Sequence, residues 1–222
     1  MVHKLSKNIF SLGIGVSLAS FLVILRLIKI SPLWGGCFSY FSLTDVLMPL
    51  SGLAGFGISC LLVATRAIFR TLVLNVSLIS VLYHIPGLCA SFYWAHNNLQ
   101  RFIGIIVPLS CMVLFILNPV GKAAALYSVL WFIPILFSMY GASNPFYKSI
   151  VSTFIAHSVG SVIWLYTKNI TAGEWLSLIP IVIVERFTFA CIMTMVYYGV
   201  RYGLQAYKTY AVRARNINER RV

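Results

Sequence analysis

Long apolar runs with almost no charged residue inside them dominate this chain of 222 residues. Charged residues make up only 9% of it, and the mean hydropathy is +0.91. A soluble domain of this length needs far more charge to cover its surface, whereas a surface in contact with lipid can be apolar. Runs of about 20 residues match the length of a helix that crosses a bilayer. We therefore predict an all-α fold, a polytopic transmembrane helical bundle.

Seven of these runs are candidates for membrane-spanning helices. They cover residues 9–28, 44–65, 72–95, 102–117, 121–140, 146–167 and 176–200. Loops rich in Lys and Arg stay on the cytoplasmic side, so charge decides between topologies. Seven crossings would put Lys4 and Lys7 on the opposite side from the basic tail at 201–222. We predict six crossings, with both termini cytoplasmic and residues 1–222 in a single integral membrane domain.

One run must then fail to cross by itself. The best candidate is 72–95, because Pro86 and Gly87 interrupt it and such residues break a helix. The run 102–117 is the second candidate, since it is short and ends at Asn118-Pro119. Six crossings also assign sides to the basic residues between the runs. Lys122 and Lys168 would lie outside. The residues inside would be Arg66, Arg70, Arg101 and Lys148.

Charge and composition exclude several classes of function. The net charge is 17 − 4 = +13, but no aromatic-basic module accompanies it, so we expect no nucleic-acid partner. The basic tail instead suits the anionic headgroups of the lipid bilayer. Five cysteines without a CxxC pair indicate no zinc site, and four acidic residues are too few for a carboxylate metal cluster. HExxH, GxSxG and P-loop motifs are absent, so we predict no catalytic residue, metal or cofactor.

The first two runs carry small residues that permit close helix packing. Gly13, Gly15, Ser17 and Ala19 form two interleaved small-xxx-small pairs, which fit either a neighbouring helix of this chain or a partner protein. In the second run Asp45 precedes Pro49 and several glycines, and we expect Asp45 to cap the start of the helix. The loop 31–44 before it is rich in aromatic residues and glycines.

Two later runs place polar and aromatic residues on one helical face. In the run 121–140 that face holds Tyr127, Trp131, Pro134 and Ser138, which is typical of packing or of a binding wall. In the run 146–167 it holds Thr153, His157, Gly160, Ser161 and Trp164. A polar stripe in an apolar helix should face the interior of the bundle. His157, near mid-span, then makes either one interhelical hydrogen bond or a ligand contact.

The last run contains Glu185 next to Arg186, both well inside it. Ionisable groups inside a span are costly, so they usually pair and often mark a path for substrates or ions. Adjacent residues of a helix diverge by about 100°. We therefore expect Glu185 to pair with another helix, with His157 as its partner, and Arg186 to pair elsewhere or to extend toward the membrane surface.

The pattern resembles the substrate-binding S-component of energy-coupling factor (ECF) vitamin transporters. The resemblance rests on the small face of the first run and on Asp45, Pro49 and the sequence Gly52-Leu-Ala-Gly55-Phe-Gly57 in the second. It implies a bacterial cytoplasmic (inner) membrane protein whose residues Gly13, Gly15, Ser17 and Ala19 dock onto a membrane coupling subunit with ATPase subunits. It also implies a small-molecule ligand near the outer side, for which the candidate contacts are Trp131, His157, Ser161, Trp164 and Glu185.

The expected function is therefore membrane transport, in which the chain binds a small solute, such as a vitamin or vitamin precursor, and helps its uptake. Two alternatives remain open at this point. A membrane-embedded enzyme acting on a lipid or isoprenoid would need Glu185 and His157 within hydrogen-bond reach of each other. A non-catalytic scaffold subunit would use its polar residues only to hold helices together.

Overall fold

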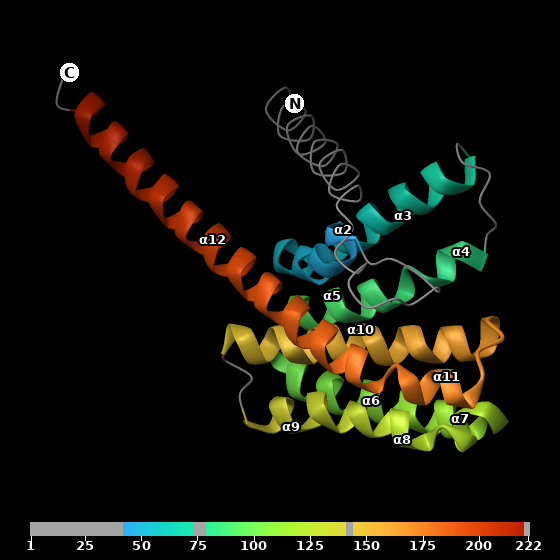
Figure 1. Ribbon diagram of the computed structural model, residues 1–222. Coiled ribbons are helices and arrows are strands. Elements are labelled where there is room, and N and C mark those ends of the chain that lie inside the picture. Colours follow the sequence, from blue (N-terminus) through green and yellow to red (C-terminus); the bar gives the residue numbers. More distant parts are fainter. Residues whose placement is uncertain (1–41, 73–78, 141–143, 220–222) are drawn as a thin grey trace.

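The computed structural model describes residues 42–72, 79–140 and 144–219 (Figure 1). The predicted first helix, its small face at Gly13, Gly15, Ser17 and Ala19, and most of the loop 31–44 lie outside the described residues. The described residues form helices joined by short turns, and they contain no β-strand. The prediction of an all-α fold is therefore confirmed for this part of the chain.

The first described helices are α2 (Leu43–Leu47), the 3₁₀ helix η1 (Met48–Ala54), α3 (Phe56–Leu72), α4 (Ile79–Leu82), α5 (Ile85–Ala95) and the 3₁₀ helix η2 (Asn97–Leu99). Of these, all but α3 and α5 span seven residues or fewer. The later helices are α6 (Gln100–Leu117), α7 (Pro119–Ala123), α8 (Ala125–Ser128), the 3₁₀ helix η3 (Val129–Trp131), α9 (Phe132–Tyr140), α10 (Pro145–Thr167), α11 (Ala172–Ser177) and α12 (Ile179–Glu219).

Helix α10 lies at the centre and packs against α5, α6, α9 and α12 (Figure 1). Two contacts show that α12 is antiparallel to it. Thr194 Oγ1 donates to Ser149 Oγ over 3.2 Å, and Thr153 Oγ1 donates to the Arg186 carbonyl over 3.5 Å. Beyond the bundle α12 continues as one helix and projects away from the other elements (Figure 1).

Basic residues mark the two ends of this bundle. Lys148 Nζ donates to Asn97 Oδ1 over 3.3 Å, which puts the start of α10 beside the start of α6 and Arg101. At the other end α7, which carries Lys122, packs against α11, just after Lys168. The four residues are thus divided between the ends as their charges predict.

Arg66 lies on α3 and has an acidic partner. It forms an ion pair with Asp45 over 3.3 Å. The next residue, Val46, packs with Ile155 and Met193 in the middle of α10 and α12. The prediction that Arg66 lies on the same side as Arg101 stays a prediction.

Asp45 also differs from the expected cap. The N-cap of α2 is Ser42, whose backbone N–H and hydroxyl donate to Asp45 Oδ2 over 3.2 and 2.6 Å. Asp45 is the third helical residue and bonds back to the cap, which is one half of a capping box. Its carboxylate still stabilises the helix start, but from inside the first turn.

Three helices are long and apolar enough to cross a membrane by length and composition: Asn97–Leu117, Pro145–Thr167 and Ile179–Tyr207. The first includes the run 102–117, which the sequence had made doubtful. The chain does break after Leu82, at Tyr83 and His84, as Pro86 and Gly87 predict. The count of six crossings remains a prediction.

Two runs that we expected to be continuous helices are interrupted. The run 44–65 breaks at Gly55, between η1 and α3. The φ of 112° at Gly55 is a backbone conformation that glycine adopts readily. The run 121–140 is divided among α7, α8, η3 and α9. Asn118 starts the first of these by accepting from the backbone N–H groups of Val120 and Gly121.

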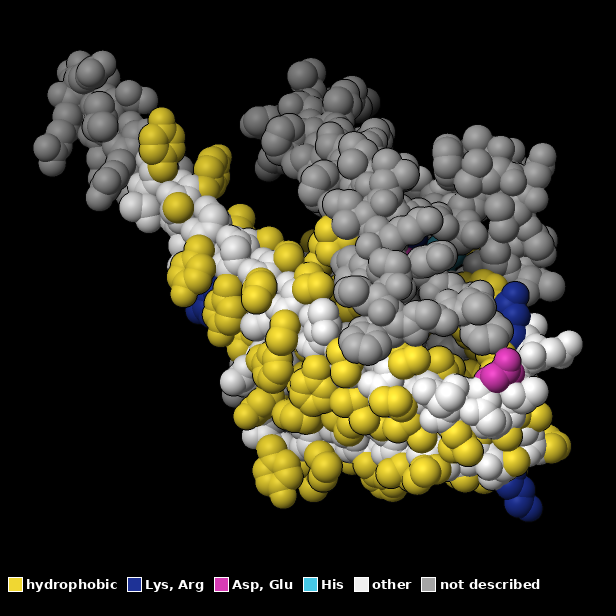
Figure 2. Space-filling view, in the orientation of Figure 1, with side chains coloured by type: hydrophobic (Ala, Val, Ile, Leu, Met, Phe, Trp, Pro, Cys, Tyr) yellow, Lys and Arg dark blue, Asp and Glu magenta, His cyan; other side chains and the backbone are white. Residues whose placement is uncertain are grey.

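Large apolar side chains cover much of the outer surface (Figure 2). Phe102, Leu117, Leu126 and Met195 are 62%, 71%, 65% and 73% exposed. They come from α6, α8 and α12, so the apolar surface runs around several helices of the bundle. A surface of this extent needs an apolar medium or a partner to cover it.

Candidate functional site

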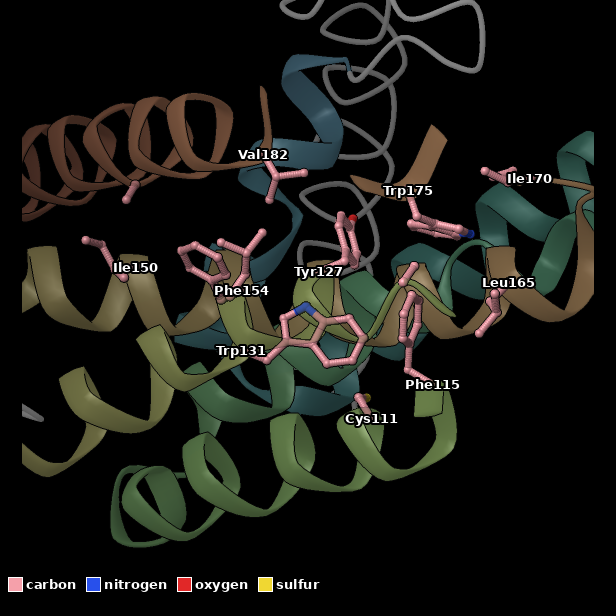
Figure 3. Close-up of a cluster of buried hydrophobic side chains, with 13 residues drawn as sticks. Cys111, Phe115, Tyr127, Trp131, Ile150, Phe154, Leu165, Ile170, Trp175 and Val182 are labelled. Carbon is pink, nitrogen blue, oxygen red and sulfur yellow. The ribbon is translucent and has the colours of Figure 1, made fainter. Parts of the chain in front are cut away.

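A cluster of buried aromatic rings surrounds Tyr127 where α8, α6 and α11 meet (Figure 3). The ring centre of Tyr127 lies 5.6 Å from that of Phe115, 6.2 Å from Trp131 and 4.9 Å from Trp175. All four rings are almost completely buried. Such close ring pairs fix the phenol in one position, because each constrains its neighbours.

The hydroxyl of Tyr127 joins this cluster to the polar stripe of α10. It lies 2.9 Å from Nε2 of His157 and 3.3 Å from Oγ of Ser161. Oγ of Ser161 is also 3.5 Å from the same imidazole nitrogen. The three side chains form a hydrogen-bonded triangle, in which the tautomer of His157 determines which atoms donate. His157 therefore makes the interhelical bond that the sequence offered as one of its two roles.

Glu185 and Arg186 form an ion pair within α12. Arg186 Nη2 donates to Glu185 Oε2 over 2.5 Å, and the Arg186 side chain is only 4% exposed. The expected pairing of Glu185 with His157 is therefore wrong. Although neighbouring Cβ atoms of a helix point apart, an arginine side chain is long enough to curl back over the backbone. The guanidinium carbon lies 4.5 Å from the ring centre of Phe189, so Arg186 does not extend to the membrane surface.

This ion pair lies beside the triangle. The charge of Arg186 interacts electrostatically with both Tyr127 and His157. Thr153, one turn before His157 on α10, donates to the backbone carbonyl of Arg186. Polar groups of α8, α10 and α12 thus form one buried region, which also holds a buried ion pair.

The remaining candidates from the sequence take different positions. The Trp131 ring is completely buried, and its Nε1–H has no hydrogen-bond partner among the described residues. Trp164 is half-buried and packs on the edge of the aromatic cluster. Tyr127, Trp131, Pro134 and Ser138 are all buried, which confirms that they share an inward face.

Two members of the region were not singled out by the sequence. Tyr127 appeared only as part of an aromatic stripe, although it is the hub of the hydrogen bonds. Trp175 follows Glu174, which forms a capping box with Thr171 at the start of α11. A capping box marks the start of a helix, here directly before the large apolar residue Trp175. It is the sequence pattern that indicates a role for Trp175.

No group of three or more His, Cys, Asp or Glu side chains able to hold a metal ion occurs among residues 42–72, 79–140 and 144–219. The region at Tyr127 is instead a set of neutral hydrogen-bonding groups with one internal ion pair. Its chemistry fits recognition of a polar group by hydrogen bonds.

Comparisons with known proteins found no family model, no curated protein and no solved structure that matches this chain.

Proposed function

We propose that this protein is an integral membrane component that binds a small solute in the middle of its helical bundle and takes part in the uptake of that solute. One observation carries the proposal: Tyr127, His157 and Ser161 form a buried hydrogen-bonded triangle beside the Glu185–Arg186 pair. Buried ionisable and polar groups inside apolar helices are costly and commonly mark a substrate path.

The positions of two lysines support the membrane setting. Lys148 and Lys168 are 20 positions apart near opposite ends of α10. At the helical rise this separation is about 30 Å, the thickness of the hydrocarbon core. Aromatic side chains accompany both: Lys148 Nζ lies 6.0 Å from the Trp94 ring centre, and Lys168 Nζ lies 5.8 Å from that of Tyr83. Basic and aromatic residues together are typical of the two membrane interfaces.

In this frame the triangle lies near the bilayer midplane. His157 is nine positions after Lys148 and eleven before Lys168, which corresponds to about 14 and 17 Å along the helix. In solution, water supplies hydrogen bonds to the polar group of a solute. At that depth the imidazole, the phenol or the Trp131 indole N–H would supply them instead. The unpartnered indole donor favours a solute that carries a hydrogen-bond acceptor.

Transport agrees better with these contacts than the other two classes do. The enzyme alternative needs Glu185 and His157 within hydrogen-bond reach of each other, but Glu185 bonds to Arg186 and His157 to Tyr127. The scaffold alternative needs no solute, and under it Trp131 is one of several buried polar groups without a hydrogen-bond partner among the described residues. The proposal includes the resemblance to ECF S-components, and a coupling subunit with ATPase subunits would then supply the energy.

The proposal is tested by measuring which small molecules remain bound to the protein through purification. The protein is purified in mild detergent, its bound small molecules are extracted with organic solvent, and they are quantified per mole of protein by mass spectrometry. Wild type should carry one compound in near-stoichiometric amount. His157→Ala and Tyr127→Phe should lose most of it, whereas Lys122→Gln, at the exposed end of the bundle, should retain it.

A wild-type protein that carries no compound after purification from several growth media would overturn the binding function. The same conclusion follows if His157→Ala, Tyr127→Phe and Lys122→Gln all carry equal amounts. Circular dichroism and a monodisperse elution profile must be the same for all variants, so that loss of solute is not loss of fold.

A further inference from the structure

Helix α12 is too long to be contained in a bilayer. It has 41 residues, which is about 61 Å of helix, twice the thickness of the hydrocarbon core. If its first residue, Ile179, lies at one edge of the core, the helix reaches the other edge about 20 residues later, near Tyr198. The rest of α12 must then continue beyond the hydrocarbon.

The contacts of α12 change at the same place. Tyr197 is the last residue with a contact to another helix among the aromatic pairs, and its ring centre lies 5.7 Å from that of Trp94. Tyr198 stacks on Tyr202 with ring centres 6.2 Å apart. From Gly199 to Tyr210 every side chain whose burial is described is exposed. Tyrosines at this level are typical of a membrane interface.

The charge of α12 changes there too. After Gly199 the helix carries Arg201, Lys208, Arg213 and Arg215 and only one acid, Glu219. Positions 201, 208 and 215 are spaced by seven residues, so they fall along one side of the helix. Tyr210, which is 73% exposed, falls on the opposite side together with position 213, and Tyr207, which is 70% exposed, lies between the two sides. The extension is therefore a basic helix with exposed tyrosines among its cations.

We propose that residues 201–219 of α12, the basic arm, bind anionic phospholipid headgroups at the membrane surface from which the helix emerges. The continuity of the helix holds Arg201 close to the headgroups, and the positive arm complements their charge. Tyrosines suit the same layer, because their rings are apolar and their hydroxyls are polar. The inference rests on α12 crossing the membrane, as proposed above, and not on solute binding.

Hydrogen exchange of the full-length protein in vesicles tests the arm. The protein is reconstituted into phosphatidylcholine vesicles with and without phosphatidylglycerol, and amide exchange is followed by mass spectrometry in peptides covering residues 203–219. An arm held by headgroups frays less, so we expect exchange about tenfold slower in the anionic vesicles. High salt should remove the difference, because it screens surface charge.

Two variants make the test specific. In a triple variant, Arg201→Gln with Lys208→Gln and Arg215→Gln, exchange should be equal in the two kinds of vesicle. Lys122→Gln with Lys168→Gln, which removes charge at the other end of the bundle, should keep the wild-type difference. Resistance to carbonate extraction is measured on the same vesicles, so that failure of α12 to cross the membrane is distinguished from failure of the arm to bind.

Equal exchange of the wild-type arm in both kinds of vesicle would refute lipid binding. So would slow exchange in anionic vesicles that persists in the triple variant or in high salt. Protection in neutral vesicles only after addition of RNA, or of a soluble acidic protein, would assign the arm to that partner and also refute the proposal.

Discussion

The phenol oxygen of Tyr127 lies 2.9 Å from His157 Nε2. This hydrogen bond joins α8, a helix of a single turn, to the central helix α10. The same oxygen also lies 3.3 Å from Ser161 Oγ. One hydroxyl therefore satisfies two polar groups of the neighbouring helix. Because all three groups lie inside the bundle, they depend on each other for hydrogen bonds.

Tyr127→Phe should destabilise the protein modestly without altering the aromatic cluster, since the ring stays and only the hydroxyl is removed. Hydrogen bonds between helices in membranes contribute about 0.6 kcal/mol on average and at most about 1.7. We expect a loss of unfolding free energy in that range, measured by titration with denaturing detergent. Tyr140→Phe is the control, because Tyr140 is 83% exposed. Equal losses in the two variants would contradict the prediction.

The Glu185–Arg186 pair should respond asymmetrically to mutation. Glu185→Gln leaves a buried guanidinium that cannot lose its charge, and breaking a buried pair costs about 3–5 kcal/mol. Arg186→Gln should cost less, because the remaining Glu185 side chain is 14% exposed, against 4% for Arg186, and its charge is better solvated. The double variant should recover part of the loss.

Unfolding free energies of the two single variants and the double variant form a complete cycle. Additive losses would show that the two side chains do not interact in the folded protein. Asp45→Asn, which breaks the more exposed pair with Arg66, is the comparison and should cost no more than about 1 kcal/mol.

Gly52 permits the close approach of η1 to α5. A Cβ at this position would lie 2.1 Å from the backbone oxygen of Ser91, which cannot move without displacing α5. Gly52→Ala should therefore reduce expression and lower the melting temperature strongly. At Gly57, a Cβ would meet nothing within 4 Å, and alanine is the better helix former there. Gly57→Ala should be neutral or stabilising by up to about 1 kcal/mol, and thermal melting of both variants checks the contrast.

Much of the architecture could be predicted from local patterns. The runs 146–167 and 176–200 are long and mostly apolar, and they form α10 and, from Ile179 onward, part of α12. Proline and glycine place the break near His84, because they act on the backbone around them. The inward face of Tyr127 and Trp131 follows from helical periodicity alone.

The rest depends on long-range contacts or on side-chain conformation. A glycine such as Gly55 fits either close helix packing or a backbone break with positive φ, and the surrounding fold selects the break. The hub role of Tyr127 requires α8 to lie against α10, 30 residues later in the chain. The divergence of about 100° between adjacent helical residues describes the directions of their Cβ atoms. It does not exclude a Glu185–Arg186 pair, because the arginine side chain has several rotatable bonds.

Glu174 provides a prediction outside the candidate membrane-spanning helices. The backbone N–H and hydroxyl of Thr171 both donate to its Oε2 over 2.7 Å, and these bonds lower the pKa of the carboxyl below its ordinary value of 4.5. Bonds that favour the carboxylate stabilise the folded protein above the unfolded-state pKa. That stabilisation is lost as the pH falls through the lower, folded-state pKa.

Thr171→Val should raise the pKa of Glu174 toward 4.5, because it removes the hydroxyl donor. The whole chain has four acidic residues, so the carboxyl carbons can be assigned in isotope-labelled protein. The measurement is a titration of the Glu174 carboxyl carbon by nuclear magnetic resonance. An unchanged midpoint in Thr171→Val would show that the hydroxyl bond does not affect the carboxyl.

The separation of basic residues between the two ends of the bundle predicts the orientation of the protein in the membrane. Arg101 and Lys148 lie at one end, and Lys122 and Lys168 at the other. Positively charged loops remain in the cytoplasm, and the basic arm of α12 lies beyond the Lys148 end. We therefore expect that end to be cytoplasmic and the Lys168 end to face outside.

Single cysteines at positions 148 and 168, placed in a variant without the five native cysteines, can be labelled in intact cells with a maleimide that does not cross membranes. Lys168→Cys should react in intact cells, and Lys148→Cys only after permeabilisation. Lys122→Cys should behave like Lys168→Cys, because both lie at the same end. Reaction of the cysteines at 148 and 168 from the same side would mean that α10 does not cross the membrane, and it would remove the midplane position assigned to His157.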